Sequence, residues 1–572
     1  MGHARRRLLH HRAFEVLEEV GAPAAQLARH ALAGGLAEQA FRYGVAAGDD
    51  AVEVFSVKDA IEHYERARDL LTEVRTGGRQ LTQPSVPDLE HLYIQLGRAH
   101  ELPEEWEKAR EAYEAMLALA REVEGARLKV GALNNLAVLA FHQESDPPRA
   151  RRLLEEARGV AEEAELEECL VETQCTLADV MTYGAGAFEH SGRLARKALA
   201  SARSLEVRPD LIARALETLA RLELFRGRLE ESATYAEEGA ELSRELAERP
   251  SPRRLLPSMP TAMGLMASWK VGNKAMEIQC LMYLAYVRVF QGRLKEGVAF
   301  GREVLGKSRE LPERAEAMGS PAISLGLLAS GEYEEALEVC LRGTELARIA
   351  QDMFLLWHNL DHLGRTYEVL LDLQEARRVY EEALELGAQL GPHYEALSSA
   401  SLRAVAALSE NWEEAYPHAR RAHEAGTSFD VLDGLYLHYE VEALLRGGDE
   451  RRAREVVRRF ADRPRTNGRE HIAYLRSMAV LSEFEGDTQR AIGQLHEARI
   501  LAEKIGLPKE LWQSQSKIGE LYERCREDGQ ARKAFFRTAQ TLRMLAGKIR
   551  DEELREGFLS ARQVRRVLGH TT

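Results

Sequence analysis

The amino-acid sequence predicts an all-α fold, a superhelical solenoid of about twelve helix–turn–helix repeats. The chain has 572 residues, more than one globular core usually needs, and Ala, Leu, Glu and Arg dominate it. All four residue types favour helices. One pattern of large and small residues recurs along nearly the whole length, and short glycine-containing turns separate its copies. Together these observations indicate a repeat array.

The repeat unit is clearest around residue 370. Leu363 and Gly364 are followed by Tyr367, and then by Ala376 and Tyr380. We expect the small residue, 13 positions after the leucine, to lie where two helices cross closely. The large residue four positions later should fill the next gap. The same frame recurs in three further places: Ile518 with Ala531, Leu96 with Ala109, and Leu219 with Ser232.

This frame resembles the tetratricopeptide repeat (TPR) family, and the resemblance covers nearly the whole chain. From Ala336 onward the steps between small residues are 40, 39, 38, 38 and 40, whereas the family's common period is about 34. We therefore expect helices about one turn longer, as in arrays that resemble the sensor arms of large bacterial regulators. The small residues predicted for the twelve pairs are Ala60, Ala109, Ala150, His190, Ser232, Gly297, Ala336, Ala376, Ala415, Ala453, Ala491 and Ala531, of which His190 fits worst.

Each pair is predicted to consist of two helices of roughly 14–18 residues joined by a tight turn. Gly227, Gly292, Gly331 and Gly486 stand where such turns are expected. Glycine readily adopts the left-handed conformation that ends a helix. No single pair can bury its apolar face alone, so each pair must stack on its neighbours.

Two segments interrupt the period. Residues 75–87 have the composition of a loop. Between Ser232 and Gly297 the step is 65 residues, and the excess lies in a segment with prolines at 250, 252, 257 and 260 and many Leu and Met residues. We expect this insert to be a hinge or a partner-binding loop, which either packs into the concave groove of a neighbouring repeat or docks a partner; an ordered loop that caps a repeat edge is the alternative. The predicted division is an N-terminal helical junction (1–36), TPR block one (37–247), the Pro-rich insert (248–272), TPR block two (273–545) and a C-terminal capping helix (546–572).

The two ends of the chain carry a second resemblance. Helical strings at residues 5–12, 28–32, 40–43 and 60–67, and a closing string at 551–559, resemble those of large bacterial STAND-class signalling ATPases. There such strings follow the nucleotide-binding and winged-helix domains and start the TPR arm. This chain lacks the ATPase and any helix-turn-helix or cyclase module. It therefore resembles the sensor arm alone, as a split gene or a truncated reading frame, and the resemblance implies a separately encoded ATPase as one partner.

Residues 301–308, from Gly301 to Ser308, match the spacing of a nucleotide-binding P-loop. A working P-loop needs a glycine-rich loop after a β-strand. Here the string falls in an expected second helix, with Gly297, Gly301 and Val304 at packing positions, and no strand is predicted before it. An NTP-binding or hydrolase activity that uses this string is the alternative function.

His358 and His362 lie four positions apart on an expected helix, a spacing that can bind zinc. Asn359 stands where the general-base glutamate of a metalloprotease helix would follow the first histidine, and no third ligand is evident. The five cysteines have no metal-binding spacing. We therefore expect no cofactor and no metal.

Charge and hydropathy restrict the partners. The formal net charge of −14 argues against direct binding of nucleic acid, which needs a basic face. No stretch approaches the roughly 20 apolar residues of a membrane span, and the basic N-terminus has no following apolar core typical of a secretory signal. Reduced thiols in a cytoplasm are the simplest interpretation of the cysteines.

These features favour a non-enzymatic sensor or scaffold in signalling or transcriptional regulation, with a protein or peptide partner or a small-molecule effector. A purely structural assembly protein is a further alternative. The TPR resemblance implies that residues two, five and nine of each first helix line a concave binding face, with an apolar middle set between charged ones. The candidates are Arg214, Glu217, Arg221, Gln279, Met282, Tyr286, His358, Asp361, Arg365, His438 and Glu442.

We predict that the purified chain does not hydrolyse ATP, because its P-loop string lies within a packed helix. Phosphate release from ATP should stay at background, and Lys307→Ala should leave it unchanged. A measurable rate that Lys307→Ala abolishes would show this prediction to be wrong.

Overall fold

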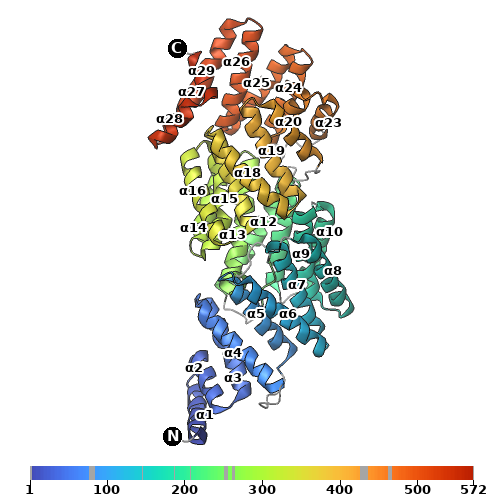
Figure 1. Ribbon diagram of the computed structural model, residues 1–572, viewed down its shortest axis with the longest axis vertical. Helices are drawn as coiled ribbons and strands as arrows, with labels where there is room; N and C mark the ends of the chain where they lie inside the picture. Colours follow the sequence, from blue (N-terminus) through green and yellow to red (C-terminus); the bar gives the residue numbers. More distant parts are fainter. Residues whose placement is uncertain are drawn as a thin grey trace. The chain divides into compact units, whose positions relative to one another are not determined.

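The computed structural model describes residues 3–75, 84–144, 146–185, 187–205, 208–249, 255–259, 265–424, 436–461 and 467–570. Within these residues it has 28 α-helices, one short 3-10 helix and no β-strand. Figure 1 shows that, within each unit, helices consecutive in the chain lie side by side as hairpins. The fold is a TPR-like helical solenoid, and the predicted fold class is confirmed.

The chain divides into two compact units. Unit 1 comprises residues 1–180, 193–218 and 239–277, and unit 2 comprises residues 181–192, 219–238 and 278–572. Because the boundary runs through α9 to α13, these five helices contribute to both units.

The first helices in chain order are α1 (His3–Glu19), α2 (Ala24–Gly34), α3 (Ala37–Glu53), α4 (Val57–Arg75), α5 (Val86–Glu101), α6 (Trp106–Glu122), α7 (Ala126–His142) and α8 (Pro147–Glu163). The helices shared between the units are α9 (Glu167–Ala185), α10 (Phe188–Ser204), α11 (Pro209–Phe225), α12 (Leu229–Glu248) and α13 (Trp269–Phe290), with the 3-10 helix η2 (Leu265–Ala267) before α13.

The remaining helices belong to unit 2. They are α14 (Leu294–Ser308), α15 (Glu313–Ser330), α16 (Tyr333–Ile349), α17 (Met353–Val369), α18 (Leu373–Leu390), α19 (Pro392–Leu408), α20 (Trp412–Glu424), α22 (Leu437–Arg446), α23 (Glu450–Ala461), α24 (Gly468–Phe484), α25 (Thr488–Ile505), α26 (Pro508–Arg524), α27 (Asp528–Lys548), α28 (Glu552–Ser560) and α29 (Arg562–Gly569).

All twelve predicted small residues lie in the second helix of successive pairs, from Ala60 in α4 to Ala531 in α27. Eleven of them are buried. His190 is only half-buried, whereas its neighbour Ser191 is fully buried, so the frame of that pair lies one residue later than the sequence suggested. Within each unit the first helices of consecutive pairs contact one another, as α5 contacts α7 and α15 contacts α17. We call the face that these first helices form the inner face of the unit.

The recurring glycine is explained by the close crossing within each pair. A Cβ atom at Gly364 in α17 would lie 2.5 Å from the Tyr380 ring of α18, and Gly97 and Gly519 meet an aromatic ring in the same way. The glycine and the aromatic residue of the frame are therefore partners in one contact.

The glycines at the predicted turns have the left-handed conformation that was expected. Gly227, Gly292, Gly331 and Gly486 have φ of 71°, 80°, 80° and 84°. Other turns place a larger residue in the same left-handed region, among them Leu371 with φ 61° and Arg526 with φ 59°. Such turns lack a glycine signal and are harder to recognise from sequence.

The P-loop string lies inside α14. A Cβ atom at Gly301 would come within 2.6 Å of the Ile323 backbone in α15, so this glycine is required by helix packing. Ser308 donates a hydrogen bond from Oγ to the carbonyl of Val304 at 2.7 Å, within the same helix. No strand precedes the string in the part of the chain that the structure describes.

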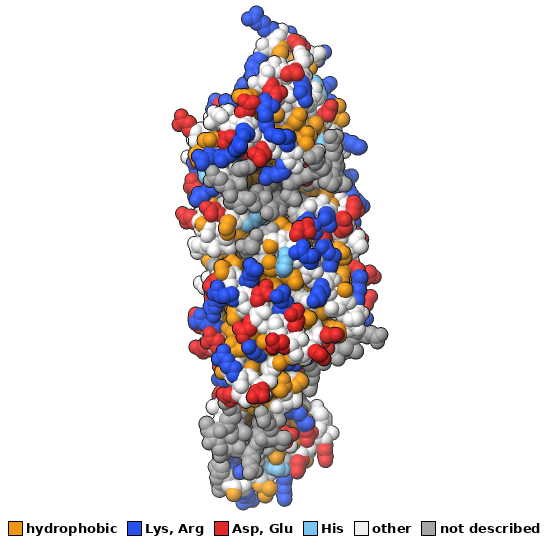
Figure 2. Space-filling view, turned by 90° about the vertical axis from the view of Figure 1, so that its right-hand side faces the viewer, with side chains coloured by type: hydrophobic (Ala, Val, Ile, Leu, Met, Phe, Trp, Pro, Cys, Tyr) orange, Lys and Arg blue, Asp and Glu red, His pale blue; other side chains and the backbone are white. Residues whose placement is uncertain are grey.

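Charges of both signs cover the surface. On the face drawn in Figure 2, Lys and Arg side chains are interspersed with Asp and Glu. None of the described helices combines the length and the apolar character needed to cross a membrane. Four cysteines are buried, and burial raises the pKa of the Cys169 and Cys175 thiols to about 12 and that of Cys340 to about 11; Cys525 is exposed.

The glycine–aromatic contact gives a direct test of the packing. We expect Gly364→Ala to destabilise α17 and α18 by about 1–3 kcal/mol, because its methyl group overlaps the Tyr380 ring. Hydrogen exchange should rise in this pair and its neighbours and stay unchanged in unit 1.

Gly493→Ala is the matched control, since nothing lies near its Cβ position in α25. It should stabilise its helix by up to about 1 kcal/mol through helix propensity alone. Equal effects of the two substitutions would contradict the packing role of Gly364.

Candidate functional site

Part of the Pro-rich insert lies along the inner face of unit 1. Between the end of α12 and the start of α13, the described residues of the insert include 255–259, which have no regular structure, and η2; residues 250–254 and 260–264 lie outside the described part. Gln95 Nε2 in α5 donates a hydrogen bond to the carbonyl of Ala267 at 2.8 Å. Arg98 Nη1, one turn later, donates to the carbonyl of Met266 at 3.1 Å. Two adjacent backbone carbonyls of the insert are therefore bound by one helix.

The other described piece is held at Ser258. Its backbone N–H donates to Glu172 Oε1 in α9 at 2.8 Å, and its carbonyl accepts from Arg214 Nε in α11 at 3.0 Å. Its Oγ donates to Asn135 Oδ1 in α7 at 3.3 Å. Three consecutive first helices thus bind one residue. We call residues 255–259 and 265–267 the docked segment, and Gln95, Arg98, Asn135, Glu172 and Arg214 the unit 1 groove.

Elementary constraints explain why the segment docks. Pro257 has no backbone N–H, and an extended chain leaves its remaining polar groups without helical partners. The groove supplies those partners. The segment also buries apolar side chains: Leu256, Met259, Leu265 and Met266 are each only 2–3% exposed. Of the alternatives left open by the sequence, packing into a groove is what the structure shows for residues 255–259 and 265–267.

Arg214 is held rigidly in the groove. It is fully buried and forms ion pairs with Asp179 and, at 2.7 Å, with Glu217. It also donates to Thr218 Oγ1 at 2.7 Å. The carboxylates of Asp179 and Glu217 balance the positive charge of Arg214 and hold its side chain in place. Its Nε therefore points at the carbonyl of Ser258. Two of the predicted candidates, Arg214 and Glu217, belong to this cluster.

A ladder of alternating charges crosses the same inner face. Arg127 in α7 lies 2.5 Å from Glu90 in α5 and 3.7 Å from Glu168 in α9. Arg208 then lies 2.8 Å from Glu168 and 2.7 Å from Asp210. Burial raises the pKa of the Glu90 carboxyl, against the opposing effect of Arg127. The ladder ties four consecutive first helices together beside the docked segment.

A cavity of about 590 Å³ opens next to this ladder. Its walls come from α3, α5, α7 and α9, and from Leu255 and Leu256 of the docked segment. Glu172 lines it as well as binding Ser258. Cavities of this size hold small ligands.

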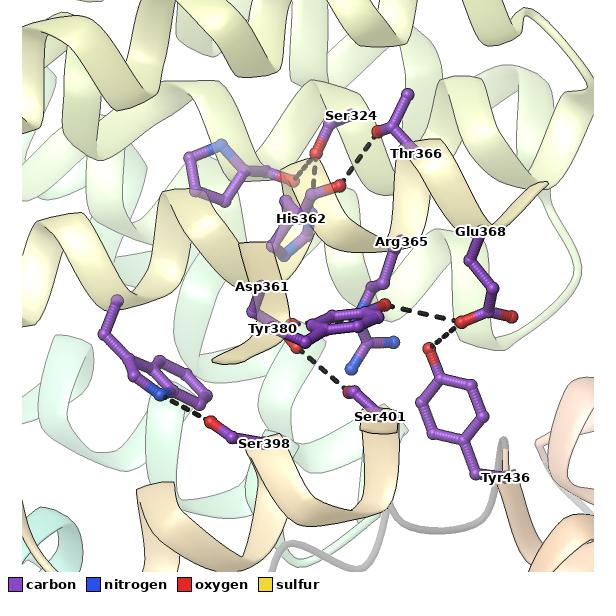
Figure 3. Close-up of polar contacts among 12 residues, drawn as sticks. Ser324, Asp361, His362, Arg365, Thr366, Glu368, Tyr380, Ser398, Ser401 and Tyr436 are labelled. Atoms are coloured by element: carbon purple, nitrogen blue, oxygen red, sulfur yellow. Dashed lines mark hydrogen bonds and ion pairs between the residues drawn. The ribbon is translucent and has the colours of Figure 1, made fainter. Parts of the chain in front are cut away.

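Side chains of unit 2 bind one another through polar contacts (Figure 3). Arg365 Nε lies 2.8 Å from Asp361, which also accepts from Ser401 Oγ at 3.5 Å. Ser324 Oγ lies 2.6 Å from Nδ1 of His362. One cavity there, lined by Arg365 and His438 among others, is about 50 Å³.

Glu368 joins distant repeats within unit 2. It accepts hydrogen bonds from Tyr380 at 3.4 Å and from Tyr436 at 3.1 Å, and it forms an ion pair with Lys509 at 2.6 Å. Lys509 lies 141 positions later in the chain. Such long-range pairs hold the inner faces of early and late repeats of this unit together.

The eleven predicted concave-face residues are all buried or half-buried. Arg214 pairs with Glu217 and Asp361 with Arg365; the other contacts join these candidates to residues outside the set of eleven. Those contacts are Arg221 over the Tyr183 ring, Gln279 to Met318 Sδ at 3.0 Å, Tyr286 against His362, His358 against Phe354, His438 against Tyr439, and Glu442 with Arg446; Met282 is half-buried. Their role in binding stays a prediction.

Four groove residues were missed by the sequence analysis: Gln95, Arg98, Asn135 and Glu172. They lie on the inner faces of first helices in earlier pairs. Carrying the same inner positions back to α5, α7 and α9 would have found this part of the array.

His358 and His362 are neutral at physiological pH. Burial lowers the pKa of His358 to about 4 and that of His362 to about 3, although the nearby Asp361 carboxylate favours the charged form. Among the described residues no group of three or more His, Cys, Asp or Glu side chains is arranged to hold a metal ion.

No family model and no curated protein matches the chain. Solved structures with a similar arrangement of helices include the APC/C hetero-tetramer Cut9–Hcn1, at 14% identity over 93% of this chain and 96% of that chain with a TM-score of 0.49. A Rap protein complexed with competence and sporulation factor has 13% identity over 74% and 100% with a TM-score of 0.44. The apo form of the quorum sensor NprR from B. thuringiensis has 10% identity over 67% and 99% with a TM-score of 0.39. At these identities the similarity concerns the helical fold alone.

The buried histidines predict acid sensitivity in unit 2. The pKa of His362 is about 3 when folded and about 6.5 when unfolded. Its neutral form therefore stabilises the fold fully above pH ~6.5, and this contribution is lost as the pH falls towards 3. We expect His362→Gln to reduce the pH dependence of the unfolding free energy by about 1.4 kcal/mol per pH unit between pH 6 and 4.

Urea unfolding followed by the fluorescence of Trp357, which lies in the same helix, would measure this effect. His11→Gln in unit 1 is the control and should leave the profile unchanged. Parallel profiles for wild type and His362→Gln would rule out a neutral buried His362.

Proposed function

We propose that this chain is a non-enzymatic binding protein, a sensor or scaffold in signalling or transcriptional regulation, whose unit 1 groove takes an extended peptide. One observation carries the proposal: the groove already holds a segment of the chain itself, irregular at Ser258 and 3-10 helical at Met266 and Ala267, by its backbone groups. Side chains of a helical array that bind backbone groups can accept more than one sequence.

The docked segment also indicates what a partner should look like. Its backbone is held at three residues, and its buried side chains are Leu and Met. A peptide that combines a small hydroxyl residue with flanking aliphatic residues matches both features. The insert is attached at both ends, so it competes at an effective concentration of about millimolar. A partner must overcome this competition before it binds.

The non-enzymatic part of the proposal rests on the P-loop string. It lies in α14, and its first glycine is needed for packing against α15. A cytoplasmic location and a separately encoded ATPase partner are further parts of the proposal. The helical strings at the two ends of the chain, which resemble those of the STAND class, support them.

Peptide competition tests the groove. A fluorescent peptide of residues 255–269 should bind a full-length variant whose own insert is weakened by Leu256→Asp and Ser258→Pro. We expect binding to the wild type to be at least about tenfold weaker, because the intact insert occupies the groove. Fluorescence anisotropy of the labelled peptide measures its affinity for the weakened variant and for the wild type.

The control peptide carries the same two changes and should not bind. Adding Gln95→Ala and Arg98→Ala to the weakened protein should lower the affinity, because these side chains bind the segment's carbonyls. Equal binding of both peptides, or none to the weakened protein, would refute a peptide-binding groove.

A further inference from the structure

The cavity beside the docked segment has an excess of negative charge. Six carboxylates and four arginines line it. The arginines already have partners: Arg42 pairs with Glu18, Arg127 with Glu90 and Arg208 with Asp210, while Arg98 binds a backbone carbonyl of the insert. Little positive charge remains for an incoming anion.

Glu172 differs from the other groups in the cavity wall. It is half-buried, and its carboxylate accepts the N–H of Ser258. Among the residues that the structure describes, it forms no ion pair. A cation that approaches closely stabilises a partly desolvated carboxylate more strongly than one that is fully in water.

Apolar side chains also line the cavity. They are Phe41 and Val45 from α3, Ile94 from α5, and Leu255 and Leu256 from the docked segment. A ligand that fits this lining carries a positive charge and an aliphatic or aromatic body.

We propose that this cavity binds an amphipathic ammonium compound, with Glu172 as its counter-ion. The ammonium group belongs either to a small organic amine or to the N-terminus of a short hydrophobic peptide.

Occupancy of the cavity and docking of the insert are coupled. Leu255 and Leu256 form part of the wall only when the segment is docked, so a ligand that touches them stabilises the docked state. By reciprocity it weakens the binding of a peptide in trans. This coupling rests on the proposed function, whereas the amine site itself does not.

Calorimetry on the full chain tests the site with 3-methylbutylamine and with leucyl-leucinamide. Their N-acetylated forms, which lack the charge, are the controls. Binding of the amine alone, or of the peptide amide alone, identifies the source of the ammonium group. No binding of either compound at millimolar concentration would overturn the proposal.

Glu172→Gln removes the negative charge but keeps the hydrogen bond to the docked segment, because the amide oxygen still accepts the N–H of Ser258. We expect this variant to bind the amines at least about tenfold more weakly while its insert stays as resistant to trypsin as the wild type. Glu163→Gln, an exposed position on α8, should bind like the wild type. Unchanged affinity in Glu172→Gln would exclude this site.

Trypsin cleavage after Arg253 and Arg254 reports on docking. The amine should slow it in the wild type and leave it unchanged in Glu172→Gln. If the amine binds through Glu172 without slowing cleavage, the coupling is wrong and the amine site stands. If the peptide of residues 255–269 fails to bind in trans but the amine still binds, the peptide-binding function is the part that fails.

Discussion

The array depends on one constraint, the crossing of two helices at a distance that leaves no room for a side chain. At Gly364, Gly97 and Gly519 an aromatic ring from the second helix occupies the space that a methyl group would need. The crossing fixes the geometry within each pair. Stacking of the pairs then brings successive first helices together on one side, so the inner faces follow from packing.

Those inner faces are polar, and polar groups brought together away from water require partners. The two units satisfy this requirement differently. In unit 1 a segment of the chain, partly irregular and partly 3-10 helical, supplies backbone groups to Gln95, Arg98, Glu172 and Arg214, and a cavity remains beside it. In unit 2 side chains pair with one another, as Asp361 does with Arg365 and Glu368 with Lys509.

The sequence predicted the elements that depend on local spacing. The twelve pairs, the glycine turns and the anomaly of the insert follow from periods of about 40 residues and from glycine and proline chemistry. His190 was misplaced by one residue because its pair has no small residue in the expected frame. The candidate site was predicted less well. Spacing shows which side chains of a first helix point inward, as for Arg214 and His358, but it does not show what fills the space opposite them. That depends on contacts between residues far apart in the sequence, such as Lys509 with Glu368, 141 residues apart.

The distribution of the cysteines has a practical consequence. Thiolates are the reactive form, and burial keeps Cys169, Cys175 and Cys340 protonated well above neutral pH. Cys280 is also buried, whereas Cys525 lies exposed at the end of α26. The native chain therefore offers one natural attachment point for a thiol-reactive probe, far along the sequence from the groove. A spectroscopic label can be introduced there without a cysteine-free background and without altering any residue that binds the docked segment.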